Sequence, residues 1–241
     1  MANAAHAAEV AVHNPSVLDA IAHSAVVRVT HWIHTLAFFA LLISGIAILI
    51  AHPRLYWGET GALGTPALIE LPLPLKLGES GWGRYLHFLA AWAAVLNGSF
   101  YVVASLVDHH FRGDLVPSAT DLTWSALRRV VSDHLHLRGF HDQASASYNV
   151  LQRLAYLGVI FALFPLVIIT GLAMSPAITS VAPPLVTIFG GQQSARTIHF
   201  FVASFLVLFL FVHIAMVCLT GFATRMRAMI MGPRAVRQAS V

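Results

Sequence analysis

Histidines inside apolar segments are the residues of this sequence best suited to chemistry. The segment RTIHFFVASFLVLFLFVH is almost purely apolar, yet it contains His199 and His213. A polar ring in an apolar medium without a partner costs several kcal/mol. Imidazole nitrogens ligate metal ions, including haem iron. The two rings therefore either lie at the ends of the segment, near water, or are ligated by a cofactor inside the structure.

The spacing of these two histidines fits a helix that serves two separate sites. Fourteen residues correspond to about 21 Å along a helix axis and fall within about 40° of a whole number of turns. His199 and His213 would then project from nearly one face, at two depths. Further histidines stand at the start of two other apolar segments, namely His31 and His34 in one and His87 in the other.

The composition indicates what kind of structure positions these residues. Of the 241 residues, 58% are hydrophobic and only 10% are charged, whereas a soluble domain has about 25% charged residues. The sequence thus predicts an integral membrane protein. No basic stripe with interleaved aromatic residues is present, so nucleic acid is not an expected partner. The single cysteine, Cys218, excludes an intrachain disulfide, a four-cysteine iron–sulfur cluster and a CxxCH haem site, and we expect a packed thiol.

Four segments are long enough to cross a bilayer, which takes about 20 apolar residues per helix. We therefore predict an all-α, integral membrane four-helix bundle in residues 26–225, between an N-terminal tail (1–25) and a C-terminal tail (226–241). The predicted helices cover about residues 30–51, 85–107, 151–174 and 197–221. The polar block 108–150 has helix-like apolar spacing in part and is expected to contain a surface helix, while 175–195 is expected to be a turn region.

Positive charge predicts the orientation of the bundle. Ten of the 14 Lys and Arg residues lie within the first 28 residues, in residues 108–153 or near the C-terminus. Cytoplasmic segments of membrane proteins carry the excess of Lys and Arg. Both termini are therefore predicted to be cytoplasmic, which agrees with an even number of spans.

This topology sorts the membrane histidines into two layers. His31 pairs by depth with His213 on the cytoplasmic side, and His87 pairs with His199 on the periplasmic side. Each layer can hold one haem between two imidazoles. His34 is an alternative to His31, because the two residues lie one helical turn apart.

An arginine precedes three of these histidines by three residues, in the sequences RVTH, RYLH and RTIH. These are Arg28, Arg84 and Arg196, each one turn nearer the headgroups than its histidine. Haem propionates need cationic partners at that depth, and the planar guanidinium suits a carboxylate. The same motif favours His31 over His34, since His31 has Arg28 as its partner.

Two plainer interpretations compete with haem ligation. A single histidine near a helix end is more often interfacial than a ligand, although four that pair by depth favour ligation. Several histidines of the polar block also offer a metal site, but their spacing matches no compact ligand template. They are His109, His110, His134, His136 and His141.

These segments resemble the bacterial cytochrome b561 family, in its hydrogenase, formate dehydrogenase and thiosulfate reductase membrane-subunit branch. The resemblance covers about residues 25–225 and rests on RVTHWIHTLAFFALLISG, GRYLHFLAAW, YNVLQRLAYL and RTIHFFVASFLVLFLFVH. It implies two b haems in a multi-pass protein of the bacterial inner membrane, in contact with lipid. It also implies electron transfer between a redox partner protein and membrane quinone, with Asn149 at the quinone. We add Tyr148 and Gln152 to that site by proximity, although a helix N-cap with a polar first turn explains these residues equally well.

Three functions are compatible with this resemblance to different degrees. The favoured one is an electron-transfer subunit. Residues 108–150 and the loop HPRLYWGETG resemble thiosulfate-reductase-type cytochromes, which implies a molybdopterin oxidoreductase as the partner. The alternative is a stand-alone quinone-linked oxidoreductase such as a superoxide oxidase, for which the loops are rather long. A non-redox membrane anchor leaves the four histidines unexplained.

Overall fold

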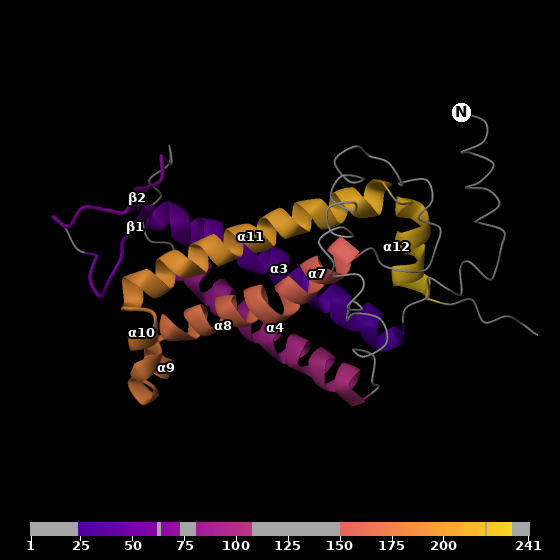
Figure 1. Cartoon of the computed structure of the whole chain (residues 1–241), viewed down its shortest axis with the longest axis horizontal. Coiled ribbons are helices and arrows are strands. Elements are labelled where there is room, and N and C mark those ends of the chain that lie inside the picture. The colour runs from indigo at the N-terminus through magenta and orange to yellow at the C-terminus, as the bar shows by residue number, and fades with distance from the viewer. Residues whose placement is uncertain (1–23, 62–63, 73–80, 108–149, 220, 233–241) are drawn as a thin grey trace, which may run out of the picture.

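The computed structural model describes residues 24–61, 64–72, 81–107, 150–219 and 221–232, and for residues 150–153 the backbone only. Long helices dominate it and run side by side (Figure 1). Within the described residues, four helical segments are long and apolar enough to cross a membrane. The predicted all-α, four-span membrane fold is thereby confirmed, and the protein is a multi-pass membrane protein. Its orientation stays a prediction.

The spans begin earlier than the hydropathy predicted. They comprise α3 (Ala25–Ala51), α4 (Gly81–Val107), a composite third span and α11 (Gln192–Leu219). The first turns of the spans contain polar residues and arginines. These residues lower the local hydropathy, so they were not counted as part of a span, but they do not prevent a helix from forming. At α3 the hydroxyl of Ser24 accepts a hydrogen bond from the Val27 amide (3.3 Å), which caps the free N–H groups of the first turn.

The third span is not the single α-helix that we predicted. It consists of α7 (Val150–Gly158), the π-helical turn η1 (Val159–Leu163) and α8 (Phe164–Ala173). Pro165 stands at the start of α8 and lacks the N–H that a continuous α-helix would need there. A π-helical turn absorbs such an interruption without ending the helix.

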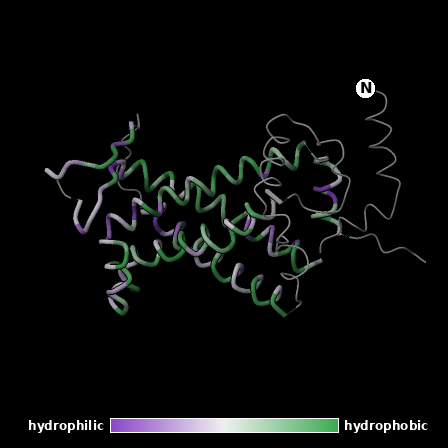
Figure 2. The backbone as a smooth tube through the Cα atoms, in the orientation of Figure 1, coloured by the Kyte–Doolittle hydropathy of each residue, from purple (hydrophilic) through white to green (hydrophobic). Residues whose placement is uncertain are grey.

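The spans pack as two helix pairs, with α3 along α4 and α11 along α8. Small side chains lie at these interfaces, including the fully buried Ser44, Thr170 and Ala173. Small residues allow helices to approach closely in a bilayer, where apolar side chains gain little from leaving the lipid. Many large apolar side chains of the spans are exposed instead. Hydrophobic residues make up most of the length of the spans (Figure 2).

Short elements lie at both ends of the bundle. One end has a two-stranded hairpin, in which β1 (Arg54–Leu55) pairs antiparallel with β2 (Ile69–Glu70) and Arg54 stands opposite Glu70. It also has two helices in the predicted turn region, α9 (Pro176–Val181) and α10 (Pro184–Ile188). The other end has α12 (Phe222–Met231), which the sequence analysis did not predict. Below we call these ends the hairpin side and the α12 side.

Two further predictions concern Cys218 and the polar block 108–150. Cys218 was expected to be packed but is exposed on α11, because that position faces away from the bundle and an apolar thiol is tolerated there. The predicted surface helix and the histidines of the polar block lie outside the described residues. Among the described residues, no three His, Cys, Asp or Glu side chains gather as a metal site.

Candidate functional site

The structure brings the four membrane histidines together as two pairs, one at each end of the bundle. On the hairpin side, the ring centroids of His87 and His199 are 6.3 Å apart. On the α12 side, those of His31 and His213 are 6.4 Å apart. We call these the hairpin-side pair and the α12-side pair. Each pair joins one of the first two spans to α11.

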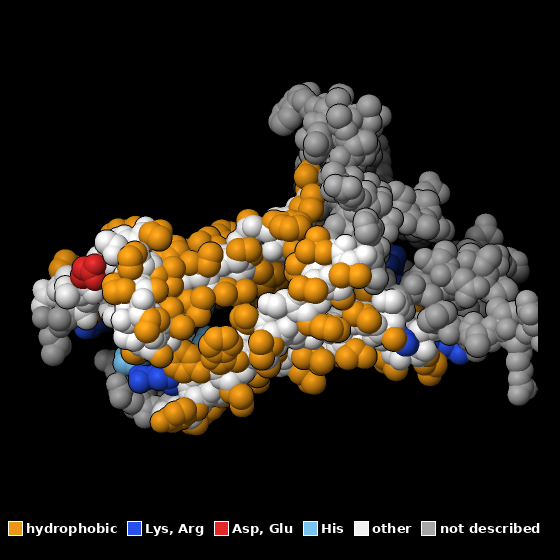
Figure 3. Space-filling model, turned by 90° about the horizontal axis from the view of Figure 1, so that it is seen from below, with side chains coloured by type: hydrophobic (Ala, Val, Ile, Leu, Met, Phe, Trp, Pro, Cys, Tyr) orange, Lys and Arg blue, Asp and Glu red, His pale blue; other side chains and the backbone are white. Residues whose placement is uncertain are grey.

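Both separations fit a metal ion held between two imidazoles. A metal–nitrogen bond is about 2.0 Å long and a ring centre lies about 1.2 Å from its nitrogen, so two rings on opposite sides of one ion have centroids about 6.4 Å apart. The surface is hollowed between the spans on the hairpin side, with histidine atoms visible in the hollow (Figure 3). The residues present therefore fit a bis-histidine haem.

The distance between the pairs follows from two helices independently. On α11, His199 and His213 are fourteen residues apart, or about 21 Å. On α3, His31 belongs to the α12-side pair, whereas Ser44 contacts His87 of the hairpin-side pair. These thirteen residues correspond to about 20 Å. Both helices thus place the two pairs at the same separation.

A hydroxyl group holds each ring of the hairpin-side pair. Ser44 Oγ lies 3.0 Å from His87 Nδ1, and Thr170 Oγ1 lies 3.0 Å from His199 Nδ1. Both hydroxyl residues are fully buried. The sequence analysis missed them, although a polar residue followed by glycine within an apolar run is a recognisable signal.

Aromatic rings surround the α12-side pair. His213 stacks on Phe209 at 6.1 Å between centroids, and His31 meets Trp32 edge to face at 5.5 Å. Trp32 Nε1 donates a hydrogen bond to the Met229 carbonyl of α12 (3.2 Å). Helix α12 therefore lies against the start of α3, close to this pair.

His34 contacts Asn97 on α4, and the proton of its neutral ring lies on the nitrogen that would have to bind a metal. The amide nitrogen of Asn97 on α4 donates to the Thr30 carbonyl (2.8 Å) and lies 3.0 Å from His34 Nδ1. Since an amide nitrogen only donates, His34 Nδ1 accepts and Nε2 carries the proton of the neutral ring. That nitrogen has no lone pair for a metal. Together with the short distance from His31 to His213, this geometry favours His31 as the ligand.

The three arginines of the RxxH motif differ in their surroundings. Arg28 donates through Nη1 to the Ile230 carbonyl (3.2 Å), while its Nε is buried with no hydrogen-bond partner among the described residues. Arg196 donates through Nη2 to the His52 carbonyl (2.6 Å). Arg84 is exposed. A guanidinium has five N–H donors, so each of these bonds leaves donors for a carboxylate.

The connection 52–61 is fastened to the first turns of α11, immediately before His199. Thr197 Oγ1 donates to the Tyr56 carbonyl (2.6 Å), and the Gly58 amide donates to Ser194 Oγ (2.7 Å). Leu55 of β1 is almost fully buried, with 1% of its surface exposed. The hairpin therefore fixes the end of the helix that carries His199. This contact is not predictable from the sequence, because most of its acceptors are backbone carbonyls, which every residue has.

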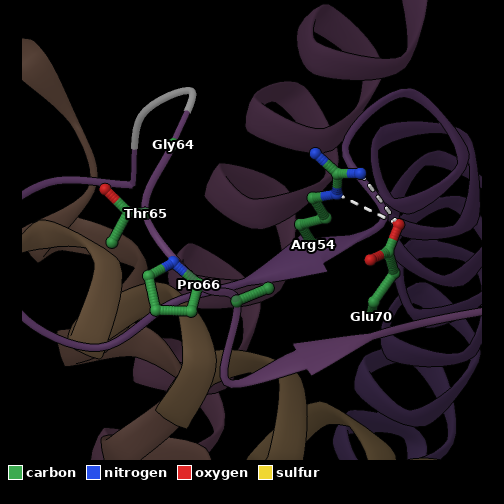
Figure 4. A pocket seen from close by; sticks show the side chains of 6 residues that line it. Arg54, Gly64, Thr65, Pro66 and Glu70 are labelled. Carbon is green, nitrogen blue, oxygen red and sulfur yellow. Dashed lines mark hydrogen bonds and ion pairs between the residues drawn. The ribbon is translucent and has the colours of Figure 1, made fainter.

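A shallow, open pocket contains none of the histidines. It lies in the hairpin, where Arg54 donates through Nε and Nη2 to Glu70 Oε1 at 3.1 and 3.0 Å (Figure 4). These hydrogen bonds raise the pKa of Arg54. Because both side chains are exposed, the pair contributes little to stability.

The predicted quinone residues cannot be placed in this geometry. Tyr148 and Asn149 lie outside the described residues, and the side chain of Gln152 is not described. The start of α7 at Val150 is consistent with either prediction for this segment, the quinone site or the N-cap.

Comparisons with known proteins show which family the chain resembles. The family described as prokaryotic cytochrome b561 matches residues 22–232. A relative from Azospira oryzae is 33% identical over 202 residues, which is 82% of this chain and 90% of the relative. It carries the provisional name protein-methionine-sulfoxide reductase subunit YedZ1. No solved structure matches the chain.

Proposed function

Because the chain belongs to the prokaryotic cytochrome b561 family, we propose that it is a di-haem cytochrome that passes electrons between membrane quinone and a partner oxidoreductase. Family membership makes it a membrane cytochrome b, an electron-transfer subunit that binds haem b. We propose in addition that it binds two haems, exchanges electrons with quinone and has a partner oxidoreductase. The observation that supports it is the presence of two imidazole pairs at metal-bridging distance, about 20 Å apart along the helices.

The four histidines and three arginines have distinct roles in this proposal. His31 and His213 hold one haem iron, and His87 and His199 hold the other. Arg28, Arg84 and Arg196 bind the propionates, and the buried Nε of Arg28 supports this role because it lacks an acceptor. A bound haem supplies one-electron iron chemistry. With two imidazoles as ligands, the iron of each site would be suited to electron transfer rather than to substrate binding.

The orientation and the partner belong to the same proposal. Both termini face the cytoplasm of a bacterial inner membrane, so the hairpin side faces the periplasm, in agreement with the distribution of positive charge. The reductase name of the Azospira oryzae relative supports electron flow from quinol to a periplasmic partner, which we propose to be a molybdopterin oxidoreductase. The relative's description as a subunit favours this function over a stand-alone oxidoreductase.

Haem content tests the function directly. The purified protein should carry about two non-covalent, low-spin b haems per chain, because the described residues offer two bis-imidazole sites and the sequence has no CxxCH motif. A pyridine haemochrome assay normalised to protein measures the ratio, and acid acetone should extract both haems. A ratio near one, or no haem, would exclude the two-site arrangement.

We propose that quinone binds at the start of α7, at Asn149 with Tyr148 and Gln152. An Asn hydrogen bond contributes about 1 kcal/mol net, so Asn149→Ala should slow haem reduction by a quinol analogue several-fold and leave both haem spectra unchanged. Stopped-flow absorbance measures the rate, and Asn97→Ala serves as the control at another intramembrane amide. Wild-type rates in Asn149→Ala would move the site elsewhere, with the hairpin side near Arg84 as the next candidate.

A further inference from the structure

Two spans present the same pair of residues to the hairpin-side histidines. On α3, Ser44 and Gly45 face His87 of α4, and on α8, Thr170 and Gly171 face His199 of α11. Both hydroxyl oxygens lie 3.0 Å from an Nδ1 atom. The two helix pairs of the bundle thus hold their histidines by the same device.

The hydroxyl groups, together with the backbone of Leu41 and Val167 to which His87 and His199 also hydrogen-bond, favour a proton on Nδ1 of each ring. Ser44 Oγ donates to the Ala40 carbonyl and Thr170 Oγ1 donates to the Leu166 carbonyl, each at 2.7 Å. A hydroxyl has one proton and two lone pairs. With that proton committed to the backbone, the oxygen accepts from imidazole Nδ1–H. The neutral rings of His87 and His199 therefore keep a lone pair on Nε2, the nitrogen opposite the hydroxyl.

Each ring also lies against the glycine that follows the hydroxyl residue. A Cβ atom at Gly45 would lie 3.7 Å from His87 Cε1, and one at Gly171 would lie 3.4 Å from His199 Cε1, which are ordinary van der Waals distances. The imidazoles therefore pack directly on the neighbouring helix, within reach of the preceding hydroxyl.

The α12-side pair has different surroundings. His213 stacks on Phe209 and His31 meets Trp32 edge to face. A buried hydroxyl oxygen thus lies beside each ring of the hairpin-side pair, and an aromatic ring lies beside each ring of the α12-side pair. An acceptor for the outer N–H of a ligand histidine fixes its orientation and makes the ligating nitrogen more basic. A more basic ligand stabilises the oxidised iron.

We propose that Ser44 and Thr170 are positioning residues that hold His87 and His199 in the ligating tautomer and lower the reduction potential of the hairpin-side haem. The inference rests on the proposed di-haem function. It predicts that removal of either hydroxyl raises the potential of this haem alone, which makes the hairpin-side site easier to reduce.

The test compares Thr170→Val, which keeps the shape but loses the hydroxyl, with Thr170→Ser, which keeps the hydroxyl. Ser44→Ala and Ser44→Thr form the matched pair on α3. Optical redox titration of the purified holoprotein gives both midpoint potentials. At a fixed solution potential, Thr170→Val should increase the reduced-to-oxidised ratio of one haem about three- to tenfold, where tenfold corresponds to about 59 mV for one electron. Thr170→Ser should behave like the wild type.

Each outcome decides between the alternatives. A positive shift, or loss of the hairpin-side haem, in Thr170→Val with wild-type behaviour of Thr170→Ser supports the proposal. Unchanged potentials, equal shifts of both haems, or equal effects of Val and Ser would overturn it. A wild-type protein without two b haems would instead refute the proposed function, so the two failures are distinguishable.

Discussion

Replacement of His213 by alanine should remove the α12-side haem and leave the hairpin-side haem in place. The methyl group of alanine cannot ligate iron, so His31 would be the one remaining ligand of the proposed pair. The hairpin-side pair lies about 20 Å away along α11 and has its own contacts to α3 and α8. The haem content should fall from about two to about one per chain. Pyridine haemochrome assays and low-temperature spectra of the α band measure this loss.

The reciprocal variant and a nearby histidine provide the controls. His199→Ala should remove the hairpin-side haem and spare the other, so the two variants should retain different spectral components. His34→Ala should keep both haems, because His34 contacts Asn97 rather than His213. If His213→Ala or His199→Ala eliminates both haems in a folded, membrane-inserted protein, the two sites are not independent. If His34→Ala loses the α12-side haem, His34 rather than His31 is the ligand.

Helix periodicity explains why much of this arrangement is predictable from the sequence. An apolar run of about 20 residues specifies a span with little ambiguity, and the fourteen-residue spacing from His199 to His213 determines both the shared face and the depth. The family resemblance rests on these residues and is confirmed by the match over residues 22–232. Ligation by the four histidines stays a prediction, now with distances that fit it.

The contacts that support the site are less predictable because they depend on packing between spans. Nothing in a single sequence says that Ser44 faces His87 or that Asn97 reaches His34, since many relative rotations of α3 and α4 bury apolar residues equally well. The hairpin contact is also hidden, because Thr197 and Arg196 donate to backbone carbonyls, which every residue has. Polar residues inside apolar runs are the signal to use, as each needs a partner in lipid.

Substitution of Gly191 by alanine should loosen the hairpin side of the bundle. Gly191 is buried and has φ +118°, a conformation that costs a residue with a Cβ atom about 1–2 kcal/mol. The new Cβ would also meet the backbone of Gly58 and Glu59. This part of the chain cannot move freely, because the Gly58 carbonyl accepts hydrogen bonds from the amides of Gln193 (3.0 Å) and Ser194 (3.3 Å) at the start of α11.

The expected cost is therefore larger than backbone strain alone. With one or two hydrogen bonds lost at about 1 kcal/mol each, the total is roughly 2–4 kcal/mol.

Gly64→Ala is the matched control, because Gly64 has φ +95° but no atom within 4 Å of the place that a Cβ would take. This variant should show the backbone strain without the clash. Since Gly191 precedes His199 by about two helical turns on the fastened end of α11, heating of Gly191→Ala should release the hairpin-side haem before the other. Thermal scans that follow the absorbance of each haem measure this order, and equal behaviour of the two glycine variants would show that the hairpin does not secure the site.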